Sequence, residues 1–201
     1  VLPALEDLRL CEHPGSAGPD AVQRLAEGLG AGALPAVTCV VVWGMHVGDA
    51  GALALAAALG RGALPRLETL VLTYAAIGDA GLVALAPALR QRPALEQLCL
   101  TGNPLGDEGL AALVAPPPPA GTPPPPTGVL TKLKFLNLTG TQITDAGCAT
   151  LAAALDSGAL PALETLYLDD IPASAAAIDA VYTALANLKE GESESEDEEA
   201  G

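Results

Sequence analysis

The stretch LETLVLTYAAIGDAGLVALAPAL (67–89) decides the fold of this chain, because near-copies of it recur along the 201 residues. Its first part, L-x-x-L-x-L, returns in VLPALEDLRL (1–10), RPALEQLCL (92–100) and ALPALETLYL (159–168). The spacings between successive copies are 32, 30, 28, 38 and 30 residues, which indicates one period of just under 30. Six repeated units are therefore expected, aligned on Leu5, Val37, Leu67, Leu95, Leu133 and Leu163.

Each unit contains a strand pattern followed by a helix pattern. Leu70 and Leu72 alternate with outward positions, as in a short β-strand. Leu85 and Leu89 stand four residues apart, as on one face of a helix. A unit of this size cannot bury its own apolar faces, so neighbouring units must stack. The pattern predicts a parallel sheet in one layer and helices in a second.

An aspartate stands just ahead of four of the helical segments, and a glycine follows it two residues later. We expect each carboxylate to accept the free N–H groups in the first turn of its own helix, which leaves no reason to assign a catalytic role. The glycines are expected to let helix and strand backbones approach closely. The aspartates are Asp49, Asp79, Asp107 and Asp145, and the glycines are Gly51, Gly81, Gly109 and Gly147.

The units resemble leucine-rich repeats of the ribonuclease-inhibitor-like subtype, the type found in Ran GTPase-activating proteins and NOD-like receptors. The resemblance covers about residues 2–188. It implies an α/β fold, a right-handed solenoid forming a horseshoe segment of about six repeats, with parallel strands on the concave face and helices on the convex face. The family usually has Asn or Cys at the third position after the strand leucines, where the side chain satisfies loop backbone groups. Here only Asn103 fits, so the loops are expected to find other partners or to be looser; the column reads His13, Met45, Ala75, Asn103, Thr141 and Ile171.

The predicted organisation is a repeat domain over 1–188 and an acidic, disordered tail over 189–201. Residues 116–128 interrupt the array with a Pro-rich insertion that begins PPPPAGTPPPP; it is expected to be an extended surface loop, with an SH3- or WW-domain ligand as the weaker interpretation. Ser193 and Ser195 each precede an acid by three residues, as in sites of acidophilic kinases. The first repeat begins in mid-pattern without a polar capping unit, so we expect that further repeats precede it in the natural protein.

The outward strand positions form three columns that are poor in charge and contain the only Trp, the only Phe and one of three Tyr. Rigid, exposed aromatic side chains are typical of interaction hot spots. The alternative is that a charge-poor face merely follows from a chain with 16% charged residues. We predict a partner-binding face that contains Arg9, Val41, Trp43, Val71, Cys99, Phe135, Asn137 and Tyr167.

Composition restricts the possible partners. The formal net charge of −15 argues against nucleic acid and against anionic membrane surfaces. The uncharged window 28–48 holds five glycines and a proline, so it is not expected to span a membrane. The four cysteines show no metal-ligand or disulfide spacing, which indicates free thiols in a reducing compartment, the cytoplasm or the nucleus. His13 and His46 lack a nucleophile at motif spacing, so no catalytic site, metal or cofactor is predicted.

The leading functional prediction is a monomeric interaction module that binds another protein through the concave face. The alternative follows from the resemblance to Ran GTPase-activating proteins, which combine such repeats with an acidic tail; it implies a small GTPase as the partner. No functional residue of that family can be carried over, because its active edge depends on polar loop residues where this chain has His13 and Met45.

Overall fold

The computed structural model describes residues 5–11, 21–114 and 130–198, with side chains as far as Glu190. Within these residues, six strands alternate with six helices. The strands are β1 (Asp7–Cys11), β2 (Cys39–Trp43), β3 (Thr69–Thr73), β4 (Gln97–Cys99), β5 (Phe135–Asn137) and β6 (Thr165–Tyr167). The helices are α1 (Ala21–Gly28), α2 (Gly48–Gly60), α3 (Asp79–Arg90), α4 (Asp107–Val114), α5 (Asp145–Asp156) and α6 (Ala175–Glu198). Each strand-and-helix pair is one of the predicted repeats.

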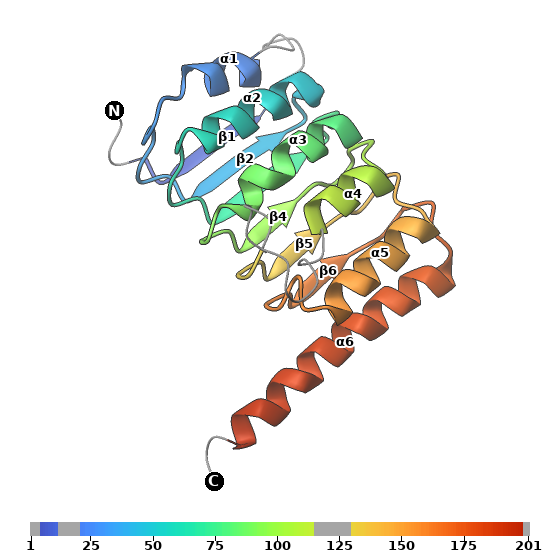
Figure 1. Cartoon of the computed structure of the whole chain (residues 1–201). Helices are drawn as coiled ribbons and strands as arrows, with labels where there is room; N and C mark the ends of the chain where they lie inside the picture. The colour runs from blue at the N-terminus through green and yellow to red at the C-terminus, as the bar shows by residue number, and fades with distance from the viewer. Residues whose placement is uncertain (1–4, 12–20, 115–129, 199–201) are drawn as a thin grey trace, which may run out of the picture.

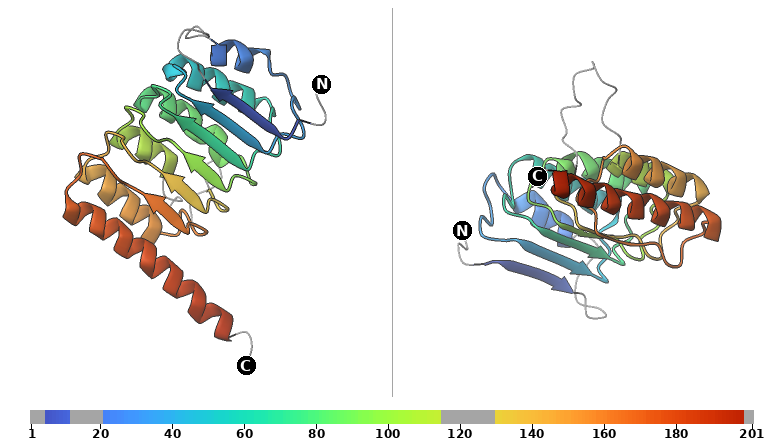
Figure 2. Two further views of the ribbon diagram at one scale, coloured as in Figure 1. Left: turned by 180° about the vertical axis from the view of Figure 1, so that it is seen from behind. Right: turned by 90° about the horizontal axis from the view of Figure 1, so that it is seen from below.

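The six strands form one parallel sheet in the order of the sequence, β1 to β6. The helices lie side by side as a second layer over one face of this sheet, as Figure 1 shows. Seen from behind, the other face of the sheet carries no helix (Figure 2). This arrangement confirms the predicted α/β solenoid of about six repeats.

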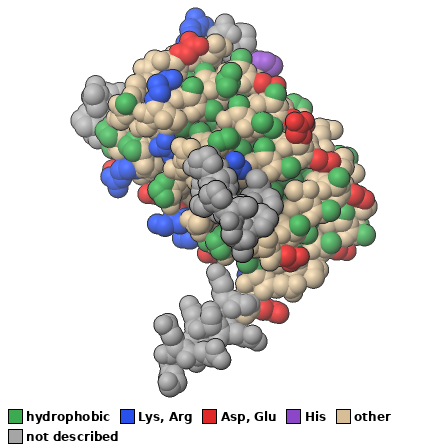
Figure 3. Space-filling view, viewed as in Figure 1, with side chains coloured by type: hydrophobic (Ala, Val, Ile, Leu, Met, Phe, Trp, Pro, Cys, Tyr) green, Lys and Arg blue, Asp and Glu red, His purple; other side chains and the backbone are tan. Residues whose placement is uncertain are grey.

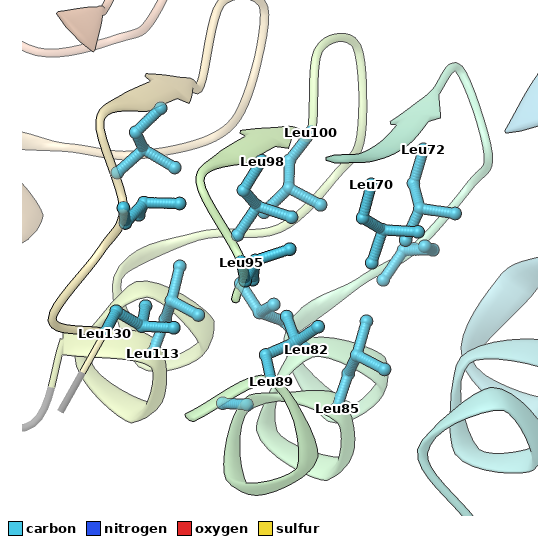
Figure 4. Packing of buried hydrophobic residues seen from close by; sticks show 14 of the residues in the cluster. Leu70, Leu72, Leu82, Leu85, Leu89, Leu95, Leu98, Leu100, Leu113 and Leu130 are labelled. Carbon is cyan, nitrogen blue, oxygen red and sulfur yellow. The ribbon is translucent and has the colours of Figure 1, made fainter. Parts of the chain in front are cut away.

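The repeated leucines fill the space between the two layers. Leu70 and Leu72 of β3 and Leu85 and Leu89 of α3 are fully buried. Figure 4 shows how leucines of successive repeats point toward one another between the sheet and the helices. Burial of each such side chain contributes about 1.5–3 kcal/mol to the free energy of unfolding. Many similar contributions of this size stabilise the stack of repeats.

The packing is less complete at the first repeat. Leu8 and Leu10 of β1 are only partly buried, whereas their register partners Val40 and Val42 are buried. A small apolar cavity lies beside them, between β1, β2, α1 and α2. β1 is an edge strand, since it pairs with β2 alone. Residues 1–4, where a cap ahead of Leu5 would lie, fall outside the described residues.

The last helix differs from the sequence-based expectation. α6 packs against α5 with Val181, Ala184 and Leu185 buried, and it continues to Glu198. It therefore includes residues 189–198, for which we expected disorder. Glutamate has a good helix propensity and no proline interrupts this segment, so the backbone can continue the helix. The Pro-rich insertion at 116–128 lies outside the described residues.

The aspartates do not cap their own helices, so that prediction is wrong. The carboxylate of Asp49 in α2 accepts hydrogen bonds from the backbone N–H groups of Gly78 and Gly81 at the start of α3, at 2.8 and 2.9 Å. Asp79 of α3 does the same for Gly106 and Gly109 at the start of α4. Each carboxylate therefore satisfies the free amides of the next repeat's helix.

The last two helix starts use a hydroxyl in addition. Asp107 accepts from the backbone N–H and the hydroxyl of Thr144, and Asp145 from those of Ser174. The Thr144 hydroxyl oxygen in turn accepts from the N–H of Ala146 in the first turn of α5. Ala175 stands in α6 where the preceding helices have aspartate, so the series of carboxylates ends there.

Gly81, Gly109 and Gly147 leave room for this inter-repeat contact, which differs from the predicted approach of helix to strand. A Cβ atom at Gly109 would lie 2.8 Å from Oδ1 of Asp79 and 3.2 Å from Cβ of Leu82. At Gly81 it would lie 2.5 Å from Oδ1 of Asp49. Glycine is thus required where the preceding aspartate reaches the helix.

Arginines supply the complementary interaction at the opposite helix ends. Arg61 donates to the carbonyls of Ala26 and Leu29 at the end of α1, at 3.1 and 3.0 Å. Arg92 donates to Leu59 near the end of α2. A cation at a helix C-terminus and an anion at its N-terminus both oppose the helix dipole. Burial lowers the pKa of Arg92.

The loops that follow the strands need partners for their backbone N–H and C=O groups, and one asparagine supplies several of them. Asn103 is buried; its side-chain oxygen accepts from the N–H groups of Ala75 and Ile77, and its amide donates to the carbonyls of Leu72 and Leu100. Loops with another residue at this position find other partners: the N–H groups of Val47 and Gly48 donate to the carbonyl of Ala75, and the hydroxyl of Thr141 donates to the carbonyl of Leu138. In the described loops, the alternative of other partners is therefore confirmed; the loop of His13 lies outside the described residues.

Candidate protein-interaction face

The open side of the sheet, which we call the strand face, has the register that the sequence predicted. The first outward column aligns Asp7, Cys39, Thr69, Gln97, Phe135 and Thr165. The second aligns Arg9, Val41, Val71, Cys99, Asn137 and Tyr167. Six of the eight predicted site residues therefore share one row across the sheet, with Phe135 in the neighbouring row. Trp43 is the eighth and lies at the end of β2.

Several polar groups in this row already have partners within the protein. The Sγ atom of Cys99 lies 3.2 Å from the hydroxyl of Thr101 and 3.6 Å from that of Thr73. The side-chain oxygen of Asn137 accepts from the N–H of Thr139 at 2.9 Å. The middle of this row, from Val41 to Asn137, therefore carries no charged side chain.

None of the five aromatic side chains lies in the core. Trp43 is 52% exposed and Tyr167 43% exposed, and Tyr74 and Tyr182 are also exposed. Phe135 is half-buried. Aromatic residues bury large areas when they fill a core, so their placement at the surface in every case is notable in a protein with so few of them.

Two of the aromatic side chains on the strand face are in contact with each other. Phe135 of β5 and Tyr167 of β6 are neighbours, with ring centroids 5.7 Å apart and ring planes inclined by 56°. Trp43 lies four strands away, about 19 Å at the usual strand spacing, so the structure does not bring it together with Tyr167. Tyr74 directly follows Thr73, the register partner of Trp43, but its ring lies against Gly102 of the next repeat.

Sequence reasoning missed Tyr74 and Tyr182. Tyr74 adopts a positive φ of 51° after the end of β3, and its ring lies against Gly102 of the next repeat. Tyr182 comes from α6 and reaches the end of β6. Burial raises the pKa of Tyr182, a hydrogen bond with the backbone of Leu168 lowers it, and the charges of Asp169 and Tyr167 raise it further. Neither residue lies in an outward column of the strands, and the sequence prediction of the binding face relied on those columns alone.

A row of charged side chains borders the strand face where the strands begin. Glu6, Glu68, Glu96 and Glu164 each stand just before a strand and continue its hydrogen-bond ladder. Lys134 occupies the same position before β5, and its Nζ lies 3.2 Å from Oε2 of Glu96. The border is thus mainly acidic.

The cysteines lie apart from one another in the fold. All four cysteines are free. Burial raises the pKa of Cys39, and a hydrogen bond with Asp7 and the charge of that carboxylate add to the effect. Among the described residues, no group of three or more His, Cys, Asp and Glu side chains could hold a metal ion. His46 is exposed, and His13 lies outside the described residues.

The helix side of the molecule is also apolar in places. Leu53 of α2 is 59% exposed and Val83 of α3 is 38% exposed. Figure 3 shows hydrophobic side chains scattered over this side. They are aliphatic and small compared with the aromatic side chains of the strand face.

Comparison with known proteins agrees with this architecture. Residues 64–86, 93–114 and 129–152 match the family model described as Leucine Rich repeat. The fold is a leucine-rich-repeat solenoid. Similar solved structures include the leucine-rich-repeat folds of a leiomodin and a tropomodulin. No curated protein sequence matches the chain significantly.

The two solved structures share the fold of this solenoid at low identity. The structure titled leiomodin-1 actin-binding site 2 has a TM-score of 0.60 and 14% identity, and covers 92% of this chain and 98% of its own. The tropomodulin C-terminal domain of Caenorhabditis elegans has a TM-score of 0.56 and 18% identity, and covers 87% of this chain and 95% of its own. In the described part of the leucine-rich-repeat chain, none of the helices has the length and apolar character that crossing a bilayer requires.

Proposed function

We propose that this leucine-rich-repeat protein is an interaction module that binds a partner protein through its strand face. The observation that carries the proposal is the exposure of Trp43 and Tyr167 on a rigid sheet whose central row is poor in charge. Exposed aromatic side chains on a rigid support lose little entropy on binding and bury a large area, as hot spots do. The predicted site residues Arg9, Val41, Val71, Cys99 and Asn137 would surround them.

The solved structures suggest a first partner to test. One of them is actin-binding site 2 of leiomodin-1. Actin cosedimentation with the 201-residue protein is therefore a direct first assay, followed by affinity capture from cell extract if actin does not bind. No specific observation favours the alternative of a Ran-type GTPase activator, since Met45 is buried and offers no polar group at the loop edge.

The decisive experiment compares two faces of the same protein. Trp43→Ala and Tyr167→Ala should each weaken capture of the partner by about 30-fold or more, because hot-spot truncations cost about 2 kcal/mol or more. Leu53→Ala on the helix side is the matched control, since it removes a side chain of comparable exposure and should leave binding unchanged. Loss of binding with Leu53→Ala alone would move the site to the helix side and refute the proposal.

A further inference from the structure

Three aromatic side chains and a carboxylate meet at the last strand of the sheet. Phe135 and Tyr167 are in contact as a tilted pair on β5 and β6. Tyr182 approaches from α6, and its phenol group interacts with Asp169 and Tyr167 at the end of β6. Asp169 follows Tyr167 by two residues and is exposed. We call Phe135, Tyr167, Tyr182 and Asp169 the β6 cluster.

The β6 cluster is not a piece of the core. Tyr167 and Tyr182 are 43% and 38% exposed, whereas the neighbouring core residues Leu166 and Leu168 are buried. The sheet and α6 hold the cluster in place, because Leu166 and Val181 pack into the apolar layer beneath it. Tyr167 and Tyr182 therefore remain accessible to solvent on a fixed support.

Most of the charges around the β6 cluster are negative. Asp169, Asp170 and Glu164 are all exposed. Of the residues whose side chains the structure describes, none forms an ion pair with these three carboxylates; the nearby Lys134 is paired with Glu96. Aromatic rings carry negative potential on their faces, and adjacent carboxylates add to it.

We propose that the β6 cluster binds an arginine side chain of the partner protein. A guanidinium group can stack on the rings of Tyr167 and Tyr182 while it donates two parallel hydrogen bonds to the carboxylate of Asp169. A lysine ammonium is a point charge without a planar face, so it would gain the carboxylate but less of the stacking. The inference rests on the proposed function, because it states which chemistry the partner brings to the C-terminal end of the strand face.

The test uses a dye-labelled tetra-arginine peptide as the probe, with tetra-lysine and tetra-glutamate as comparisons, and fluorescence anisotropy at physiological salt. We expect tetra-arginine to bind the wild-type protein more tightly than tetra-lysine, and tetra-glutamate not to bind. Tyr167→Ala and Asp169→Asn should each weaken tetra-arginine binding about two- to fivefold, the range of a cation–π contact or an exposed ion pair.

Matched variants separate this site from the general attraction of an acidic protein for cations. Asp156→Asn removes the same charge from the exposed end of α5, and Tyr74→Ala removes an exposed tyrosine from another loop; both should bind tetra-arginine as the wild type does. Equal losses in Asp156→Asn and Asp169→Asn, or equal binding of tetra-lysine and tetra-arginine, would overturn the inference. Such a result leaves the proposed function standing as long as Trp43→Ala still reduces partner capture.

Discussion

Asp79 of α3 accepts hydrogen bonds from the backbone N–H groups of Gly106 and Gly109 at the start of α4, at 2.7 and 2.8 Å. Both glycines are buried, so these amides have no ready access to water. A side chain in one repeat thus satisfies the helix start of the next. The start of each such helix therefore depends on the aspartate of the repeat that precedes it in the sequence.

Asp79→Ala should destabilise the protein by about 1–3 kcal/mol, because it leaves two buried donors without an acceptor. The loss should be local: amide hydrogen exchange at Gly106 and Gly109 should accelerate more than exchange in α2. Glu108→Ala is the control, since Glu108 also lies in the first turn of α4 but is exposed, and its removal should cost less than 1 kcal/mol. Equal effects of the two substitutions would contradict the inter-repeat cap.

Gly109→Ala tests the same contact from the opposite partner. In a helix this substitution normally stabilises by about 1 kcal/mol. Here the added methyl group would lie 2.8 Å from Oδ1 of Asp79, so we expect a destabilisation of about 1–3 kcal/mol, measured by urea denaturation. Gly60→Ala at the end of α2 is the control, since nothing lies within 4 Å of that position, and it should be neutral or stabilising. A stabilised Gly109→Ala protein would refute the role of this glycine.

Sequence reasoning identified the repeats and the strand columns because these depend on period alone. Alternation places Leu70 inward and Val71 outward in any strand with one buried face, and the common period aligns Val71 with Val41 and Cys99. The partner of Asp79 could not be read in this way. The aspartate recurs once in every repeat, so it stands at a regular distance both from the start of its own helix and from the start of the next helix. The sequence pattern therefore cannot tell which of the two helices the carboxylate caps.

The aromatic surface was only partly predictable for a related reason. Phe135 and Tyr167 fall in strand columns and were identified. Tyr182 lies on α6 and meets Asp169 only because α6 packs against the last repeat. Contacts between a terminal helix and the sheet follow from tertiary packing, which no repeat period encodes.

Asn103→Ala should be among the most harmful single changes in the loops. Asn103 is 1% exposed and its side chain bonds to backbone groups of two repeats. We expect a loss of about 2–4 kcal/mol, since several buried groups lose their partner together. Thr141→Ala removes one hydrogen bond at the equivalent position, from the hydroxyl to the carbonyl of Leu138, and should cost about 1 kcal/mol. Chemical denaturation of both variants measures the difference, and a Thr141→Ala loss as large as that of Asn103→Ala would contradict it.

Alkaline pH should weaken the fold through Cys148. Burial raises the pKa of this thiol, and the carboxylates of Asp145 and Asp107 raise it further. The pKa of this thiol is therefore higher in the folded protein than in the unfolded chain, where it is about 8.5. The resulting stabilisation is complete at a pH below the unfolded-state pKa, and it is lost as the pH rises toward the folded-state pKa. The free energy of unfolding should therefore fall between pH 8 and pH 10. Cys148→Ala lowers stability at every pH by leaving a cavity, but its decline over this interval should be shallower than that of the wild type.

Urea denaturation at pH 7, 8, 9 and 10 measures this slope, and Cys11→Ala provides the control. Cys11 is an exposed thiol, so its removal should reproduce the wild-type decline, while the buried thiol of Cys148 should account for the difference between the variants. Burial also raises the pKa of Cys39, which is still present in Cys148→Ala. Part of the fall in stability at alkaline pH should therefore remain in that variant. Parallel curves for Cys148→Ala and the wild type would show that the buried thiol does not couple protonation to folding.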